Sequence, residues 1–173
     1  QGLANCAGNM LRMPVTETNA ATTLDLLKLN VVAGLALAGL AAPHLEQAGG
    51  AVVFYGSVHA RRAFPGAAAY AASKGAVEVM SRVLAAELGP KGIRVNCLIP
   101  GAVPTDINVR AGLAADAAEN EARLHSMKAD HPLGRIGTPE EVAEAADYLL
   151  RAKWTTGTSL VVDGGLSLGV SYK

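Results

Sequence analysis

The sequence predicts an α/β fold, a doubly wound parallel sheet with helices on both faces. Short continuous apolar runs such as Ala51–Tyr55 alternate with longer segments that have helical periodicity. Runs without polar alternation are typical of strands that are covered on both faces. Half of the 173 residues are hydrophobic, which is enough to bury one sizeable core. Ligands of such a sheet bind at the carboxyl ends of its strands.

The first part of the chain predicts two strands and one long helix. Residues 2–5 resemble the end of a strand, and Ala51–Tyr55 is a complete buried strand. Between them, leucine and valine at helical spacing predict a helix from about Thr22 to Leu45. The longest apolar stretch in it, Val31–Pro43, is shorter than the ~20 residues that a membrane-spanning helix needs. We therefore expect a buried helix and no membrane partner.

The second part continues the alternation of helix and strand. Glycine and proline end most of the segments, and Thr138 begins a capping pattern with proline at the first helical position. The expected elements are a helix at Ala67–Leu88, a strand at Arg94–Ile99, a mobile lid with helical pieces at Thr105–Met127, a helix from Thr138 to about Leu150, and a strand at Ser159–Asp163.

These elements form a single domain over residues 1–173 in which the sheet is present only in part. About four strands are visible, and a sheet of that size would leave an apolar edge exposed to water. Since the first segment resembles the end of a strand, we expect further sequence before Gln1.

Composition excludes several classes of function. Fifteen basic and fifteen acidic residues cancel, so no global field favours nucleic acid or an anionic membrane. Cys6 and Cys97 are too few for a disulfide framework, and their apolar neighbours predict two buried thiols in a cytoplasmic protein. The four histidines have no ligand spacing, so no metal is predicted.

Tyr70 and Lys74 are the first candidates for chemistry. Residues four apart on a helix share a face, so the phenol and the ammonium can cooperate. A free tyrosine has a pKa of about 10, and a nearby desolvated cation lowers it toward neutrality, where the phenol becomes an effective acid or base. The alternative is a core tyrosine beside an exposed lysine. Ser57 follows a buried strand 13 residues before Tyr70, at a carboxyl end.

The arrangement of Ser57, Tyr70 and Lys74 on a strand, a loop and a helix resembles the short-chain dehydrogenases/reductases, which have a Rossmann-like sheet. Other motifs of that family match in order along nearly all of the chain. They are Asn-x-Ala-Gly at residues 5–8, the mid-helix Asn30, Pro-Gly-x-x-x-Thr at residues 100–105, Pro-Leu-Gly-Arg at 132–135, Thr-Pro-Glu-Glu at 138–141 and Asp-Gly-Gly at 163–165.

The resemblance implies a role for each catalytic candidate. Tyr70 would exchange the proton on the substrate oxygen, and Lys74 would lower the pKa of Tyr70 and bind the nicotinamide ribose. Ser57 would hydrogen-bond the reacting oxygen and hold the substrate in place. Asn30 would hold a water that links Lys74 to solvent. The alternatives are a turn serine for Ser57 and a helix-bending buried amide for Asn30.

The resemblance also implies NAD or NADP as cofactor. Asn5, Ala7 and Gly8 would pack on its adenosine side, where a small residue lets the backbone approach. The nicotinamide amide and the pyrophosphate would be covered by Pro100, Gly101, Val103 and Thr105. His59 and Asn108 border the expected substrate space without an assigned role. The family's glycine-rich turn and the residue that selects NAD or NADP would precede Gln1, so this preference cannot be read.

Three functions remain open. The first is an NAD(P)-dependent oxidoreductase that interconverts a secondary alcohol and a ketone, such as a sugar, a polyol or a 3-oxoacyl thioester. The second is a truncated, non-catalytic partner subunit of a homologue, and the third is a lyase or epimerase on the same scaffold. In the family, the two long alanine-rich helices pair across a dimer axis, which implies a homodimer or homotetramer.

Overall fold

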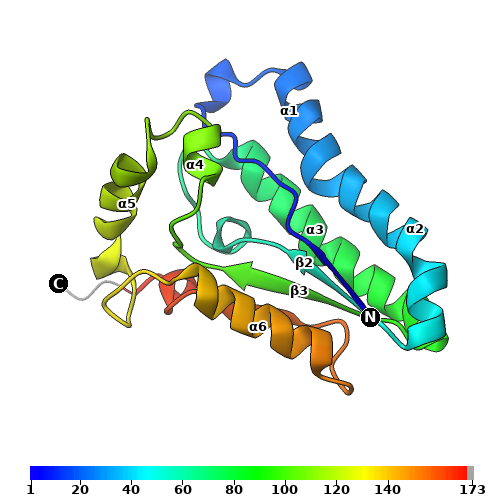
Figure 1. Ribbon diagram of the computed structural model, residues 1–173. Coiled ribbons are helices and arrows are strands. Elements are labelled where there is room, and N and C mark those ends of the chain that lie inside the picture. The colour runs from blue at the N-terminus through cyan, green and yellow to red at the C-terminus, as the bar shows by residue number, and fades with distance from the viewer. Residues whose placement is uncertain (171–173) are drawn as a thin grey trace.

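A computed structural model describes residues 1–170 and contains a four-stranded parallel sheet in the order β1-β2-β3-β4. The strands are β1 (Gly2–Asn5), β2 (Ala51–Tyr55), β3 (Arg94–Pro100) and β4 (Ser159–Val162). Spatial order follows chain order, so every connection is a crossover and all four carboxyl ends lie at the same edge (Figure 1). The predicted α/β fold with a parallel sheet is confirmed.

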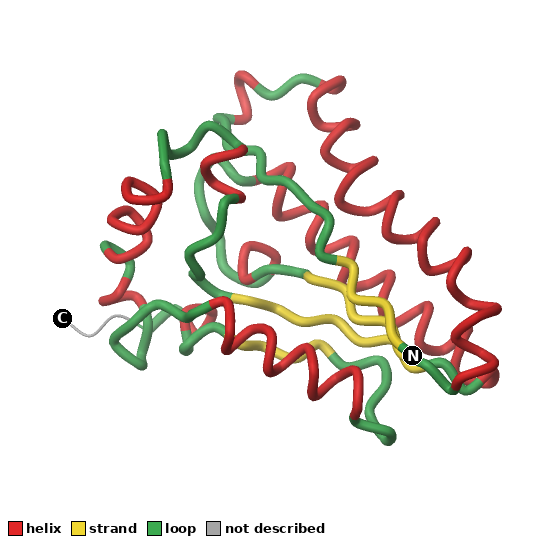
Figure 2. Tube along the Cα trace, in the orientation of Figure 1, coloured by secondary structure: helices red, strands yellow, loops and turns green. Residues whose placement is uncertain are grey.

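Helices cover both faces of this sheet (Figure 2). One face is packed by α2 (Ala33–Ala48) and α3 (Ala68–Leu88), and the other by α6 (Pro139–Arg151). The remaining helices are α1 (Ala20–Leu27), α4 (Ile107–Arg110) and α5 (Ala117–His125). Each predicted element is present with its bounds displaced by at most a few residues.

The first helix is longer than predicted. α1 and α2 are joined by a π-helical turn at Lys28–Val32 into one helix over Ala20–Ala48, which is long and apolar enough to cross a membrane. The expectation of a buried helix with an apolar stretch too short to cross a membrane was wrong, because the apolar character extends on both sides of Val31–Pro43 and much of the helix is exposed. Only one side of α2 is buried, where small residues such as Gly34, Ala38 and Ala42 approach the sheet.

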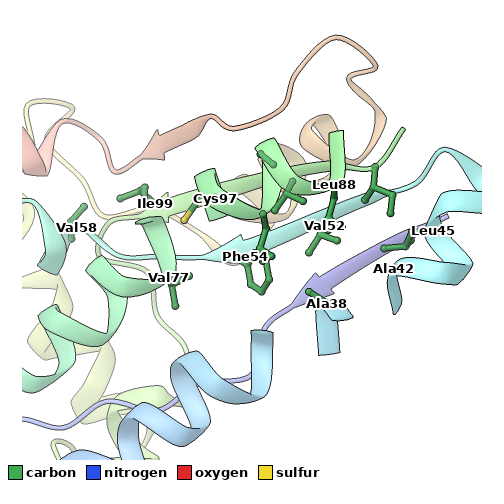
Figure 3. Packing of buried hydrophobic residues seen from close by; sticks show 14 of the residues in the cluster. Ala38, Ala42, Leu45, Val52, Phe54, Val58, Val77, Leu88, Cys97 and Ile99 are labelled. Carbon is green, nitrogen blue, oxygen red and sulfur yellow. The ribbon is translucent and has the colours of Figure 1, made fainter. Parts of the chain in front are cut away.

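Alternation along the strands divides the core into two layers. Val52 and Phe54 of β2 point toward α2 and α3 together with Cys97 and Ile99 of β3 (Figure 3). The intervening residues pack on the opposite face against α6; they are Val53 and Leu98, with Ala146 and Leu149 from the helix. Because helices bury both faces of the sheet, the strands β2 and β3 are mostly continuous apolar runs.

The two cysteines differ, and the expectation that both are buried was wrong for one of them. Cys97 lies in the core, and burial raises the pKa of its thiol to about 11. Cys6 is exposed because it follows the last paired residue of β1, the edge strand, at the open end of the sheet. Both thiols are free.

Two local motifs fix the chain near the carboxyl ends of the strands. Glu141 N donates to Thr138 Oγ1 and Thr138 N donates to Glu141 Oε2, so the predicted capping box begins α6. After β4, Asp163 accepts hydrogen bonds from Gly165 N and Ser167 N. Gly165 has φ +87°, and a Cβ there would collide with Pro132, which explains the glycine.

The predicted lid, Thr105–Met127, contains the expected helical pieces, α4 and α5. A buried hydrogen bond from Asn108 Nδ2 to Asn120 Oδ1, 2.8 Å long, joins them, and Asn120 Nδ2 donates to the Thr105 carbonyl. The lid is therefore a folded cap over the carboxyl-end side of the sheet (Figure 1). Its mobility stays a prediction.

Candidate active site

A cavity of about 430 Å³ lies at the carboxyl ends of the strands, where the fold predicts a ligand. Strand ends, the start of α3 and the lid all contribute to its walls. Eight predicted site residues line it: Gly8, Ser57, Tyr70, Lys74, Pro100, Gly101, Val103 and Thr105.

The first turns of α3 bring Tyr70 and Lys74 to this cavity, where both side chains are more than 90% buried. Lys74 Nζ lies 5.8 Å from the centre of the Tyr70 ring and donates a 2.8 Å hydrogen bond to the Tyr55 carbonyl. Burial lowers the pKa of Lys74 to about 8. The rest of the ammonium's donors remain for a ligand in the cavity that Lys74 lines.

Ser57 is placed where β2 ends and the short turn Val58–Ala60 begins, and its side chain is also buried. Burial raises the pKa of Tyr70, and a hydrogen bond with Ser57 lowers it by less. In this structure burial of the phenol dominates, and the lowering of its pKa by Lys74 stays a prediction. A neutral phenol beside Ser57 is a proton donor.

Asn30 lies in the π-helical turn, and its side-chain amide makes three hydrogen bonds to protein groups, one accepted and two donated. Its Oδ1 accepts from Asn9 N, and its Nδ2 donates to the Asn9 carbonyl and to Ser73 Oγ. A Cβ added at Gly8 would come within 3.4 Å of Asn30 Oδ1 and 3.5 Å of Lys74 Nζ, so the three residues converge. The bound water proposed for Asn30 stays a prediction.

His59 contacts both Ser57 and Tyr70, which the sequence did not predict. Its Nδ1 lies 3.2 Å from Ser57 Oγ, and its ring stacks on Phe64 and meets the edge of Tyr70. Burial, followed by the charge of Arg12, lowers the pKa of His59 to about 4. A neutral imidazole therefore lies beside the Ser57 hydroxyl. Its position two residues after Ser57 was the only sign in the sequence that His59 lies at the site.

The residues present fit a nicotinamide cofactor. Lys74 retains donors for ribose hydroxyls, and Gly8 leaves open the space beside it. Pro100–Thr105 forms the facing wall. Asn5 and Ala7 are not in the lining: Asn5 is buried under α2 and accepts a hydrogen bond from Ala7 N, so their contact with cofactor stays a prediction.

Several lining residues were missed or misjudged from the sequence. Arg12 precedes the first helix, and Arg110 and Arg123 belong to the lid. Nothing in their spacing marks them as neighbours, because more than a hundred residues separate the first from the last. Cys6, expected in the core, and Asn108, left without a role, also line the cavity.

Comparison with known proteins agrees with this geometry. A family model described as enoyl-(acyl carrier protein) reductase matches residues 1–167. The chain belongs to the short-chain dehydrogenase/reductase family. The family uses NAD or NADP, and its members similar to this chain are named as dehydrogenases and reductases.

Two curated members of the family illustrate the similarity. The chain is 43% identical to inactive 2-(S)-hydroxypropyl-CoM dehydrogenase 2 of Xanthobacter autotrophicus over 96% of its length and 73% of that protein. It is 39% identical to L-fucose dehydrogenase of Bos taurus over 91% of its length. The chain spans only 58% of this second relative.

Solved structures of family members show the same fold. Aldohexose dehydrogenase of Thermoplasma acidophilum has a TM-score of 0.89 at 28% identity, covering 99% of this chain and 69% of that one. Gluconate 5-dehydrogenase of Burkholderia cenocepacia, in complex with NADP and tartrate, has a TM-score of 0.85 at 30% identity. The match with gluconate 5-dehydrogenase covers 98% of this chain and 66% of that one.

Proposed function

We propose that this protein is an NAD(P)-dependent oxidoreductase that interconverts a secondary alcohol and a ketone. The observation that carries the proposal is the convergence of Ser57, Tyr70 and Lys74 as buried side chains on one cavity. Retention of all three residues favours hydride transfer over lyase or epimerase chemistry. The family's dehydrogenases and reductases support the reaction class.

The bound nicotinamide would supply or accept the hydride. During reduction, Tyr70 donates its phenolic proton to the carbonyl oxygen, to which Ser57 also donates a hydrogen bond. Lys74 would hold the ribose hydroxyls, and its ammonium stabilises the phenolate that remains on Tyr70. Asn30 holds the water that returns a proton toward Lys74. In oxidation of the alcohol, Tyr70 accepts the proton instead.

The Tyr70→Phe variant tests this proposal, because phenylalanine keeps the ring and removes the proton. We expect turnover to fall by about 10²- to 10⁴-fold, the usual contribution of general acid–base catalysis. The dissociation constant of NADH or NADPH, measured by nicotinamide fluorescence, should remain nearly unchanged. Tyr148→Phe, at an exposed tyrosine of α6, is the matched control. Undiminished turnover in Tyr70→Phe would contradict the proton-transfer role.

A non-catalytic partner subunit is the second candidate. The observation in its favour is the name of the 43% identical relative, which describes that protein as inactive. Absence of turnover by the purified protein with a panel of ketones, together with its binding to a full-length homologue, would favour the subunit role over the oxidoreductase. Activity of the purified protein alone would exclude the subunit role.

The edge of β1 supports a further part of the proposal. Within residues 1–170, β1 pairs with β2 alone, which leaves backbone groups free on its other side. We propose that a strand bearing the family's glycine-rich turn completes the sheet there in the whole protein. An intact mass well above 17.7 kDa for the natural polypeptide is the expected result.

The free thiols of Cys6 and Cys97 support a cytoplasmic location.

A further inference from the structure

The charged side chains that line the active-site cavity are all basic. Besides Lys74 they are Arg12, Arg110 and Arg123, and no aspartate or glutamate is among the lining residues. None of these arginines forms an ion pair with a carboxylate in the described part of the chain, whereas Arg61 and Arg135 do. The cavity therefore carries positive charge that the protein does not neutralise.

Arg12 lies at the end of the cavity where the proposed reaction takes place. Its neighbour Met13 donates a 2.8 Å backbone hydrogen bond to the Gly66 carbonyl, which holds this segment against the loop before α3. A Cβ at Gly66 would lie 3.4 Å from Arg12 Cγ. The charge of Arg12 also reaches His59, which contacts Ser57. An anion bound by Arg12 would thus lie near the reacting group.

Arg110 and Arg123 come from the lid. The Asn108–Asn120 hydrogen bond fixes α4 against α5, so the two arginines belong to one folded cap. Arg123 Nη1 donates a 2.9 Å hydrogen bond to the Leu113 carbonyl, which positions its guanidinium and leaves other N–H groups for a ligand. The cap thus adds two guanidinium groups to the basic lining of the cavity.

Apolar side chains make up most of the remaining lining. They are Met10, Val58, Phe64, Ile107, Leu124, Met127 and Leu166. Such a cavity accommodates an aliphatic body, and the guanidinium groups accommodate a carboxylate or phosphate with which they form paired hydrogen bonds. A neutral polyol would make no use of this positive charge.

We propose that the substrate is a small aliphatic ketone or secondary alcohol that carries an anionic group, bound by Arg12, Arg110 and Arg123. This inference rests on the proposed oxidoreductase function. The same charge chemistry could instead serve the phosphates of the cofactor, and the experiment separates these two sources of the anion.

Equilibrium binding tests the anion site without turnover. The full-length protein, saturated with its cofactor, is titrated calorimetrically with butanoate, butyl phosphate and neutral butanamide. We expect one of the anions to bind at least tenfold more tightly than butanamide, and Arg12→Met to weaken it by about ten- to a hundredfold, as for a lost charged hydrogen bond. Arg151→Met, at an exposed arginine of α6, is the control and should change nothing. Equal binding of all three probes, or of none, overturns the proposal.

Two further measurements distinguish the possible failures. If the arginine variants raise the dissociation constant of the cofactor and not that of the anion, the arginines serve the cofactor and the proposal is wrong. In turnover, acetoacetate should have a higher kcat/KM than acetoacetamide, and Arg12→Met should reduce that preference through KM. Selective anion binding with no turnover of either ketone would leave the anion site intact and count against the proposed oxidoreductase.

Discussion

Single residues at the site show how burial and function conflict. The side chains of Tyr70 and Lys74 are almost completely buried. Burial raises the pKa of Tyr70 and lowers that of Lys74, so it favours the neutral form of both groups. The pair is held together by the protein around it: Ser73 Oγ donates to the Tyr70 carbonyl and accepts from Asn30, while Lys74 donates to the Tyr55 carbonyl. Burial of the Lys74 ammonium therefore lowers the free energy of unfolding, and it places a reactive group at the cavity.

The depressed pKa of Lys74 predicts a pH dependence of stability. Between pH of about 8, where the folded lysine titrates, and 10.5, where the unfolded one does, the unfolded state binds more protons. Stability due to this group therefore rises with pH across that window and does not change below it. The buried Cys97 thiol and Tyr70 phenol, whose pKa values are raised, contribute the opposite slope above about pH 9, so the Lys74 contribution is measured as a difference. Chemical unfolding at several pH values should show a more positive slope of stability against pH in the wild type than in Lys74→Met. An exposed control, Lys91→Met, should retain the wild-type slope.

At the scale of elements, the structure departs most from the sequence in the helix over Ala20–Ala48. Leucine spacing predicted an uninterrupted α-helix, but the backbone has a π turn in which Ala33 N donates to the Lys28 carbonyl. The turn contains Asn30, whose hydrogen bonds to Asn9 and Ser73 tie this helix to the loop after β1 and to α3. Because those partners are distant in sequence, periodicity alone could not reveal the turn.

The capping box of α6 gives a prediction at the same scale. Removing the hydroxyl in Thr138→Ala leaves Glu141 N without its cap, and we expect a loss of about 1 kcal/mol in the free energy of unfolding. Thr138→Ser keeps the hydroxyl and should recover most of that loss in denaturant titrations. Equal destabilisation by both variants would show that the methyl group and not the cap matters.

At the scale of the whole molecule, the exposed apolar surface is concentrated on two helices. Eight large apolar side chains are exposed there: Leu24, Leu29, Val32, Leu35, Leu37 and Leu40 in Ala20–Ala48, and Val79 and Val83 in α3. A contiguous apolar surface of this kind marks an interaction site. It supports the proposed homodimer or homotetramer.

Oligomerisation can be tested at Leu40, whose side chain is 74% exposed. In light scattering after size exclusion, the wild-type full-length protein should have the mass of a dimer or tetramer. Leu40→Asp should reduce that mass because a charge would be buried in the interface. The control is Leu133→Asp, at an equally exposed loop residue outside these helices. A monomeric wild type would exclude this assembly.

The sequence by itself determined the order of strands and helices and the positions of Ser57, Tyr70 and Lys74. These features depend on residues close together in the chain: the apolar run of β2, the four-residue spacing on α3 and the capping pattern at Thr138. Such local patterns persist whatever the rest of the molecule does.

Only the tertiary structure decided which side chains share the cavity and how their chemistry is altered. Arg12 lines the same cavity as the lid arginines, His59 contacts Ser57, and Cys6 is exposed at the open end of the sheet. The raised pKa of Tyr70 likewise follows from burial by surrounding elements. Each of these facts arises from contacts between segments far apart in sequence, and burial and electrostatic fields are properties of the assembled whole.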